Sequence, residues 1–373
     1  MVRQLTPVER RSAFGARPAA PADGAGPAPV PVSEFLAYLE RRVLGSSVVH
    51  HEVLPARPER LVRDLSAFPA SVPRILAAAG IEALYSHQAE GIGRLLAGDN
   101  VVVATPTASG KSLVYNVPVM AALLEDPTAH ALYVFPLKAL VQDQYAELRA
   151  VLDRLDCTLG VEVYDGDTPD HRRRRIRANP PHVLITTPDM LHAGLLGFHE
   201  SWSSFFARLR YVVLDELHTY SGVFGSHVLH LLRRLHRVCA LYGSAPAFVA
   251  SSATIGNPEE LASRLVGRPF HPVVDTGAPS PRRHFVFVNP PGSPNPLAAS
   301  LLRQSVQRQL RTIVFTRARV ITELIYRWAT QSRPDLRRLI SSYRAGYLPE
   351  ERRQIETALN SGDLLGVVST SAL

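Results

Sequence analysis

The chain has 373 residues, 46% of them hydrophobic, and its 41 Lys and Arg against 33 Asp and Glu give a formal net charge of +8. This length can bury two hydrophobic cores, so we expect two domains and an extension. No apolar run reaches the length of a membrane span and the N-terminus lacks a signal peptide, which favours a cytoplasmic protein without a membrane partner. Cys157 and Cys239 have no Cys or His at metal spacing, so neither a disulfide framework nor a zinc site is predicted.

Basic charge is concentrated near the C-terminus. Residues 281–373 contain 14 Arg and Lys but only six Asp and Glu. This excess favours a polyanion as partner, although surplus arginine is also typical of a solvated surface. The densest basic run, residues 172–175, is predicted to be the solvated start of a helix rather than a DNA contact.

Residues 1–80 form an N-terminal extension in this interpretation. Ala, Pro and Gly dominate residues 13–32, which is typical of a disordered segment. Ser33 then stands where it can cap a short helix over residues 34–44.

Residues 81–275 alternate strands with helices. Apolar runs typical of buried strands occupy residues 100–104, 131–135, 161–164, 182–186, 211–214 and 247–250. Helical patterns lie between them, for example at residues 137–153 and 225–242. Such an order predicts an α/β lobe with a parallel sheet buried on both faces and with ligands at the carboxyl ends of its strands.

Residues 276–296, rich in Pro, Gly and Ser, are expected to link this lobe to a second one over residues 297–373. A strand is predicted at residues 282–288. The second lobe has predicted helices at 298–309, 320–331 and 349–359, and strands at 312–316, 338–341 and 365–369. Because the pattern stops just after a strand, we expect the second lobe to be incomplete and the chain to be truncated.

Residues 100–113 read NVVVATPTASGKSL and place Gly-Lys-Ser between a strand and a helix. In that context free backbone N–H groups and the helix dipole attract phosphate, Lys111 reaches the β- and γ-phosphates, and Ser112 holds Mg²⁺. Thr105 and Ala108 stand where many such loops have glycine. Lys111 and Lys138 are the only lysines in an arginine-rich chain, which favours a specific role for a compact ammonium.

Asp215 and Glu216 directly follow an apolar strand. A carboxylate at that position can hold the Mg²⁺ that Ser112 contacts, and Glu216 can then orient and deprotonate water. An acidic pair after a strand is also typical of a helix N-terminus. The phosphate-binding loop upstream favours the catalytic interpretation.

The tetrapeptide D-E-L-H at residues 215–218 resembles the Walker B segment of DEAD/DEAH-type superfamily 2 helicases, and the resemblance continues in order across residues 84–373. Those enzymes usually have A-x-T-G-S-G-K-T as their loop, which accounts for Thr105. Segments similar to the Q segment and to motifs Ia, Ib, III, IV and the first half of V begin at residues 85, 135, 186, 252, 313 and 366.

Longer segments of the sequence, such as L-Y-S-H-Q-A and D-E-L-H-T-Y-S-G-V-F-G-S-H, resemble bacterial helicases of the mitomycin-repair type and their fungal relatives. Those are 3′→5′ DNA translocases with a C-terminal four-cysteine zinc domain. Neither that domain nor motif VI is found in these 373 residues.

The resemblance implies tandem RecA-like P-loop NTPase lobes with parallel sheets, the second incomplete, and ATP and Mg²⁺ as cofactors. The expected ATP-binding residues are Tyr85, Gln88, Thr105, Thr107, Ala108, Ser109, Gly110, Lys111 and Ser112. The expected catalytic residues are Lys111, Asp215 and Glu216, the metal ligands are Ser112 and Asp215, and the residues that couple nucleotide state to movement are His218, Ser252 and Thr254. The expected nucleic-acid contacts are Lys138, Gln142, Thr187, Asp189, Thr316, Arg317, Tyr343, Arg344 and Thr370.

The sequence is thus interpreted as an ATP-dependent DNA helicase that moves on single-stranded or partially duplex DNA, in DNA repair. An RNA-dependent ATPase shares the same motifs and stays open as an alternative. A module that binds ATP and nucleic acid but scarcely hydrolyses ATP is a further one, because arginines of the missing motif can be worth 10³–10⁵ in rate.

Overall fold

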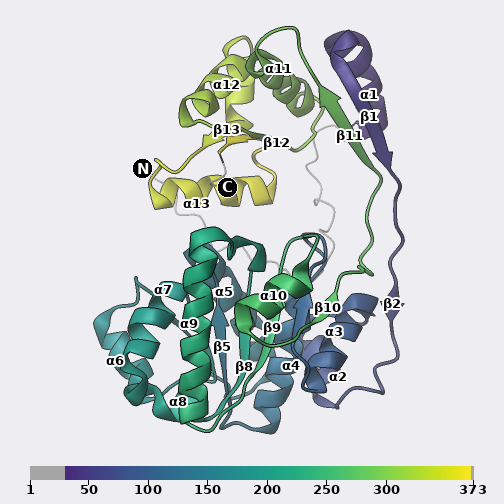
Figure 1. The fold of residues 1–373 in the computed structure, drawn as a ribbon. Coiled ribbons are helices and arrows are strands. Elements are labelled where there is room, and N and C mark those ends of the chain that lie inside the picture. The colour runs from purple at the N-terminus through teal and green to yellow at the C-terminus, as the bar shows by residue number, and fades with distance from the viewer. Residues whose placement is uncertain (1–29, 371–373) are drawn as a thin grey trace. The chain divides into compact units, whose positions relative to one another are not determined.

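The computed structural model describes residues 30–370, except the side chains of Ala139 and Pro349. Contacts divide the chain into two compact units, shown as ribbons in Figure 1. The first is Arg57–Ser280, and the second combines residues 30–56 with residues 281–370. The sequence-based boundaries differ from this division, since they kept residues 1–80 together. Residues 13–29, most of the segment expected to be disordered, lie outside the described residues.

The first unit is built on a seven-stranded parallel sheet in the order β10-β4-β9-β8-β5-β7-β6. The strands are β4 (Val101–Val103), β5 (His130–Val134), β6 (Val161–Tyr164), β7 (Val183–Thr186), β8 (Leu209–Leu214), β9 (Ala247–Ser251) and β10 (His271–Val273). The α/β class and the parallel sheet are confirmed, and the six predicted apolar runs coincide with β4 to β9 to within two residues. The edge strand β10 was not predicted.

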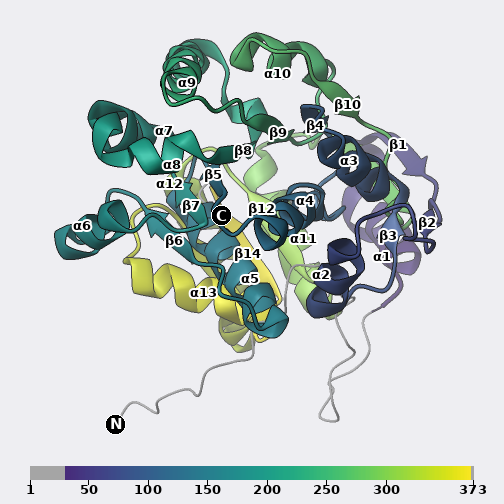
Figure 2. The same ribbon diagram turned by 90° about the horizontal axis from the view of Figure 1, so that it is seen from below.

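Helices cover both faces of this sheet (Figures 1 and 2). One face carries α2 (Ser71–Ala79), α3 (Ser86–Leu96), α4 (Ser112–Glu125) and α5 (Lys138–Leu155). The other carries α6 (Asp170–Ala178), α7 (Pro188–Met190), α8 (Ser203–Ala207), α9 (Gly222–Leu241) and α10 (Pro258–Val266). Alternate strand residues feed the two cores: Val101 and Val103 lie in one, and Val102 lies in the other. The buried sheet therefore leaves only its strand ends exposed to ligands.

Short elements complete the first unit. The two-residue strands β2 (Leu61–Val62) and β3 (Leu84–Tyr85) pair antiparallel. Helical turns follow α7 and β8: η3 (Leu191–Leu195), η4 (Leu196–Trp202) and η5 (Leu217–Thr219). Within residues 30–370, no helix is long and apolar enough to cross a bilayer.

The second unit has a smaller parallel sheet in the order β12-β14-β13. Its elements are β12 (Thr312–Phe315), β13 (Ile340–Tyr343), β14 (Gly366–Ser369), α11 (Pro294–Val306), α12 (Arg319–Gln331) and α13 (Pro349–Ser361). Strand β13 begins two residues later than predicted because Pro334–Arg338 forms a helical turn, η6. Leu302, Ile325 and Val368 are fully buried in its core.

An antiparallel ribbon joins two distant parts of the sequence within the second unit. Strand β1 (Val48–Leu54) pairs with β11 (Arg283–Val288). The N-terminal helix is present as α1 (Val32–Leu39), followed by helical turns η1 (Glu40–Leu44) and η2 (Gly45–Ser47). The predicted cap at Ser33 is wrong, since the helix begins one residue earlier, after Pro31. Phe35 and Leu39 are buried in a small core with Leu297 and Leu301 of α11. This packing is the physical reason why residues 30–56 belong to the second unit.

Candidate functional site

The loop between β4 and α4 has the shape of a phosphate cradle. Ala108 and Gly110 adopt φ angles of 61° and 76°, in the left-handed region. The hydroxyls of Thr105 and Ser109 are buried and 2.7 Å apart, so one donates to the other across the base of the loop. Thr105 thus closes the loop where other loops of this type have glycine. The left-handed conformation costs Ala108 about 1–2 kcal/mol, which the closed loop has to offset.

Lys111 lies folded over this loop. Its Nζ donates to the carbonyls of Thr105 and Pro106, at 3.0 and 3.2 Å. Burial lowers the pKa of the ammonium, and the charges of Glu216 and Asp215 act in the opposite direction. The lysine and the two acidic residues, far apart in the sequence, are therefore electrostatic neighbours at one edge of the sheet.

Asp215 follows β8 and accepts a hydrogen bond from the hydroxyl of Ser251, at the end of neighbouring β9. Burial raises the pKa of Asp215 to about 6; the negative charge of Glu216 adds to this, and the Ser251 hydrogen bond and Lys111 oppose it. A buried carboxylate in this environment is one that a cation stabilises in its charged form. Asp215 and the hydroxyl of Ser112, at the first residue of α4, are oxygen ligands of the kind Mg²⁺ takes, so the residues fit that ion.

Of the three residues expected to couple nucleotide state to movement, His218 lies beside Glu216. Nδ1 of His218 is 3.3 Å from Oε2 of Glu216 and accepts a hydrogen bond, also 3.3 Å, from the backbone N–H of Ala253. The contact between His218 and the Ser-Ala-Thr segment therefore uses the backbone of Ala253 rather than the side chains of Ser252 or Thr254. Ser252 is buried with its N–H bonded to the carbonyl of Val103, and Thr254 is exposed.

Gln88 joins the start of α3 to the phosphate-binding loop. Its Oε1 accepts from the N–H of Tyr85 at 2.8 Å, and its Nε2 donates to the carbonyl of Gly110 at 3.0 Å. Gly110 has a φ of 76°, which favours glycine, and a Cβ there would lie 2.5 Å from this Nε2 and displace it. Both ends of the Gln88 amide are engaged within the protein, and its predicted part in adenine recognition would need these contacts to rearrange.

Sequence reasoning assigned no role to His87, although it lies inside the Y-S-H-Q segment. The ring is buried and bonded on both sides. Nδ1 accepts from the N–H of Gly277 at 3.1 Å, so Nε2 carries the proton and donates to the carbonyl of Ser109 at 3.1 Å. Burial lowers the pKa of the imidazole, which favours this neutral form. His87 thus ties the loop to the segment that follows β10.

Ser251 was also missed, because a serine that ends a buried strand carries no distinctive sequence signal. Of the expected ATP-binding residues, Tyr85 and Gln88 come from the β3–α3 junction and the others from the β4–α4 loop. Thr107 and Ala108 are exposed at the tip of the loop, and Ser109 is buried. Gln88 and His87 hold the two segments together.

Four expected nucleic-acid contacts lie in the first unit, after the neighbouring strands β5 and β7. Lys138 and Gln142 are exposed on the first turns of α5, and Nζ of Lys138 donates to Asp167 at 2.7 Å. Asp189 is exposed on α7, and Thr187 before it is buried. These residues therefore share the carboxyl edge of the sheet with the phosphate-binding loop.

The other expected contacts lie at the carboxyl ends of the three strands of the second unit. The hydroxyls of Thr316 and Thr322 are 2.8 Å apart and hydrogen-bonded. Thr370 follows β14, and its backbone carbonyl accepts a hydrogen bond from the hydroxyl of Ser369. Tyr343 is buried and donates to Glu356 at 2.5 Å. Nε of Arg344 donates to Glu323 at 2.7 Å. Arg317 is exposed, and within residues 30–370 no acidic side chain forms an ion pair with it.

Residues 85–261 match the protein family described as DEAD/DEAH box helicase. The chain belongs to this family. It is 46% identical over 338 residues to the "Uncharacterized ATP-dependent helicase YprA" of Bacillus subtilis, covering 87% of this chain and 44% of that protein. It is 38% identical over 313 residues to the "ATP-dependent helicase hrq1" of Schizosaccharomyces pombe, covering 79% of this chain and 29% of that one.

Among solved structures, the chain is similar to the "DUF1998 helicase MrfA bound to DNA and AMPPNP", with a TM-score of 0.86 and 42% identity. That match covers 91% of this chain and 48% of MrfA. The resemblance to mitomycin-repair-type helicases and the RecA-like fold are thereby confirmed. The chain spans half or less of the length of each of these relatives.

Proposed function

We propose that this chain binds and hydrolyses ATP with Mg²⁺ and uses the cycle to move along single-stranded DNA, as part of a DNA repair helicase. The observation that carries the proposal is the gathering of Lys111, Asp215 and Glu216 at one edge of a parallel sheet, after strands β4 and β8, which both pair with β9. Phosphoryl transfer needs little more from a protein than positioning and charge at the phosphates.

The phosphates of ATP would lie on the backbone N–H groups at the start of α4. Lys111 would exchange the carbonyls of Thr105 and Pro106 for phosphate oxygens, which costs two neutral-acceptor hydrogen bonds and forms stronger charge-assisted ones. Ser112 and Asp215 would hold Mg²⁺, which, when bound, neutralises charge on the phosphates. Glu216 would orient the attacking water and take its proton.

A short path leads from the proposed base to the segment after β9. Glu216 is adjacent to His218, and His218 accepts from the backbone of Ala253. A shift of Glu216 during hydrolysis would therefore be transmitted through His218 to the segment between β9 and α10. Lys138, Gln142, Thr187 and Asp189 share that edge of the sheet and would hold the sugar–phosphate backbone without reading bases, which suits sequence-tolerant movement.

DNA is proposed as the track because the similar MrfA structure is described as bound to DNA. ATP turnover should be measured with oligo-dT, with an RNA oligonucleotide of matched length, and with neither. We expect strong stimulation by oligo-dT. A preference for RNA would contradict the choice of DNA, and negligible turnover under all three conditions would favour a binding module over an enzyme.

The Glu216→Gln variant provides the matched control for the chemistry. Loss of a general base costs about 10²–10⁴ in rate, while the neutral amide leaves the phosphate cradle intact. We therefore expect ATP binding to persist, measured by titration with a fluorescent ATP analogue, and turnover to fall by at least 100-fold. Undiminished turnover would refute the assigned base.

A further inference from the structure

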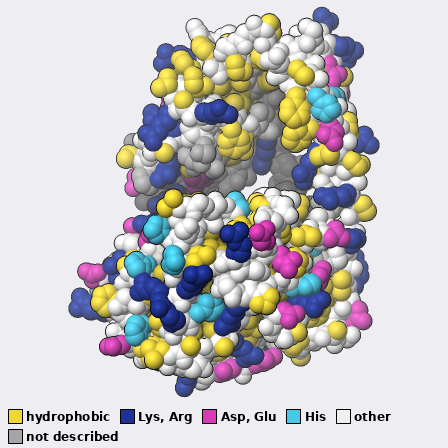
Figure 3. Space-filling model, viewed as in Figure 1, with side chains coloured by type: hydrophobic (Ala, Val, Ile, Leu, Met, Phe, Trp, Pro, Cys, Tyr) yellow, Lys and Arg dark blue, Asp and Glu magenta, His cyan; other side chains and the backbone are white. Residues whose placement is uncertain are grey.

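The outer face of α9 is strongly basic. Its twenty residues include three arginines and three histidines and no acidic side chain. An open groove of about 800 Å³ runs along its second half beside the end of α10. We define the α9 basic face as His230, Arg233, Arg234, His236, Arg237 and Arg268. Figure 3 shows Lys, Arg and His side chains gathered over this helix.

The arginines of this face are not neutralised. Within residues 30–370, none of them forms an ion pair with a carboxylate. Arg234 instead donates to His192 at 2.6 Å, and Arg268 donates to the carbonyl of Pro246 at 3.0 Å. Both acidic residues of α10, Glu259 and Glu260, lie in its first turn, whereas the groove is beside its end, and Glu260 is paired with Arg264.

Helix α6 is the informative contrast. Its arginines are as closely spaced, yet Arg172 and Arg175 both pair with Glu162, and Arg173 pairs with Asp170. Three of the five α6 arginines are thus paired inside the unit, and Arg174 and Arg177 have no ion-pair partner among the described residues. On the α9 basic face no arginine has a carboxylate partner in that same part of the chain, and such a surface attracts anions.

The α9 basic face lies away from the proposed ATP site. Strand β10 starts three residues after Arg268, and Asn100, which precedes β4, donates to the carbonyl of Pro269. The groove is therefore at the amino edge of the sheet, opposite the edge that carries Lys111. Arg237 is also about 22 Å along α9 from its first residue, at 1.5 Å per residue. An anion here would not be the nucleotide.

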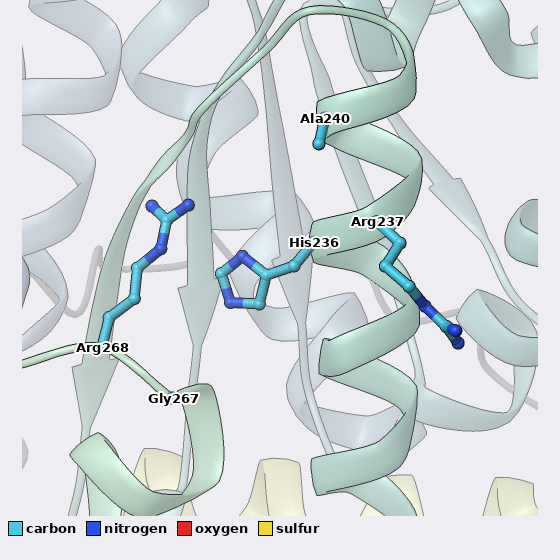
Figure 4. A pocket seen from close by; sticks show the side chains of 5 residues that line it. All are labelled: His236, Arg237, Ala240, Gly267 and Arg268. Atoms are coloured by element: carbon cyan, nitrogen blue, oxygen red, sulfur yellow. The ribbon is translucent and has the colours of Figure 1, made fainter.

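The aromatic rings near this face are already covered. Phe248 is buried beneath His236 and Arg268, with ring and guanidinium contacts of 4.9 and 5.7 Å. Tyr242 stacks on Phe206. In the close-up of Figure 4, His236 reaches from α9 toward the segment of Arg268, while Arg237 points to the opposite side. Among its six defining residues the face thus offers cations and imidazoles but no Phe, Tyr or Trp ring on which an unpaired base could stack.

We propose that the α9 basic face binds the phosphate backbone of duplex DNA adjoining the single strand on which the protein moves. Single-strand sites combine basic groups with stacking rings, whereas a duplex hides its bases and presents phosphates. One or two basic residues per helical turn, from His230 to Arg237, match a linear array of charge. This inference rests on the proposed action on DNA and adds a second contact outside the translocation path.

The test compares two double variants that remove equal charge. Arg233→Gln with Arg237→Gln alters the α9 basic face. Arg94→Gln with Arg149→Gln is the control, because those arginines lie on α3 and α5, on the other face of the sheet, in exposed pairs worth little energy. Binding is measured by fluorescence anisotropy at several salt concentrations, with oligo-dT and with the same oligo-dT extended by a duplex.

For the duplex-extended probe, we expect the α9 variant to show a slope of log K against log salt that is smaller in magnitude by about 2, because each lost phosphate contact reduces it by about 0.9. The control variant should keep the wild-type slope. Oligo-dT binding and oligo-dT-stimulated ATP turnover should match the wild type. Equal slopes in both variants would overturn the proposal. An equal loss on oligo-dT alone would overturn the duplex assignment. If the wild type binds neither probe, the proposed function itself fails, and the inference with it.

Discussion

Glu147 on α5 offers a quantitative test of the electrostatics around the site. Its Oε1 is buried without a hydrogen-bond partner within residues 30–370. Burial, with the charges of Asp143 and Asp215 adding to it, raises the pKa of this carboxyl from 4.5 to about 7. The Glu147→Gln variant keeps the shape of the side chain and removes its titration.

The direction of the effect follows from where the proton is held. The unfolded chain releases the Glu147 proton near pH 4.5, and the folded protein holds it up to about pH 7. The contribution of Glu147 to the free energy of unfolding is therefore fully present below about pH 4.5 and is lost as the pH rises from there through about 7. From pH 5 to pH 8 the loss is about 2–3 kcal/mol. At about 2–4 °C per kcal/mol for a unit of this size, this corresponds to about 5–10 °C in Tm.

The assay is thermal unfolding of the wild type and Glu147→Gln at both pH values. Any constant cost of the buried amide cancels when the two differences are subtracted. We expect Glu147→Gln to gain about 5–10 °C relative to the wild type between pH 5 and pH 8. The same difference at both pH values would show that Glu147 is ionised in the folded protein, and would refute the reasoning.

Three further variants test the loop and its supports. Ala108→Gly relieves the left-handed φ and should raise the free energy of unfolding by about 0.5–1 kcal/mol, measured by thermal unfolding; a lower Tm would contradict the strain. His87→Ala removes the shorter of two hydrogen bonds to the carbonyl of Ser109, leaving only the 3.5 Å one from Gln88, and should weaken ATP binding about tenfold, at about 1–1.5 kcal/mol per hydrogen bond. Unchanged affinity in a nucleotide titration would contradict this. Ser251→Ala removes the donor to Asp215 and should raise the Mg²⁺ concentration needed for half-maximal ATP turnover several-fold; an unchanged Mg²⁺ curve would argue against that support.

The first unit could be predicted well because its signals are local. Strands β4 to β9 are short apolar runs buried on both faces, and the segments after β4 and β8 carry Gly-Lys-Ser and the acidic pair. Parallel strands bring their carboxyl ends to one edge, so residues after different strands become neighbours. The closeness of Lys111 to Asp215 and Glu216 follows from that rule.

What could not be predicted depends on distant partners. Strand β1 becomes a strand by pairing with β11, and no local pattern links two segments so far apart. Strand β10 has three residues, one of them Pro272, which suits an edge and weakens any sequence signal. The roles of His87 and Ser251 likewise arise from the atoms they meet, Gly277 and Asp215, in other parts of the chain.

Whether an arginine is free to bind a polyanion also depends on residues distant in the sequence. Along the sequence, the run from Arg172 to Arg175 is the densest basic stretch, and the sequence already favoured a solvated helix over a DNA contact there. In the folded protein Glu162 lies against this run and forms ion pairs with Arg172 and Arg175, so part of its charge is neutralised internally. Arginines 233 and 237 are less conspicuous in sequence, but no carboxylate within residues 30–370 pairs with them. The surface available to a polyanion is therefore set by which carboxylates the fold brings near each arginine, and the α9 variants measure that directly.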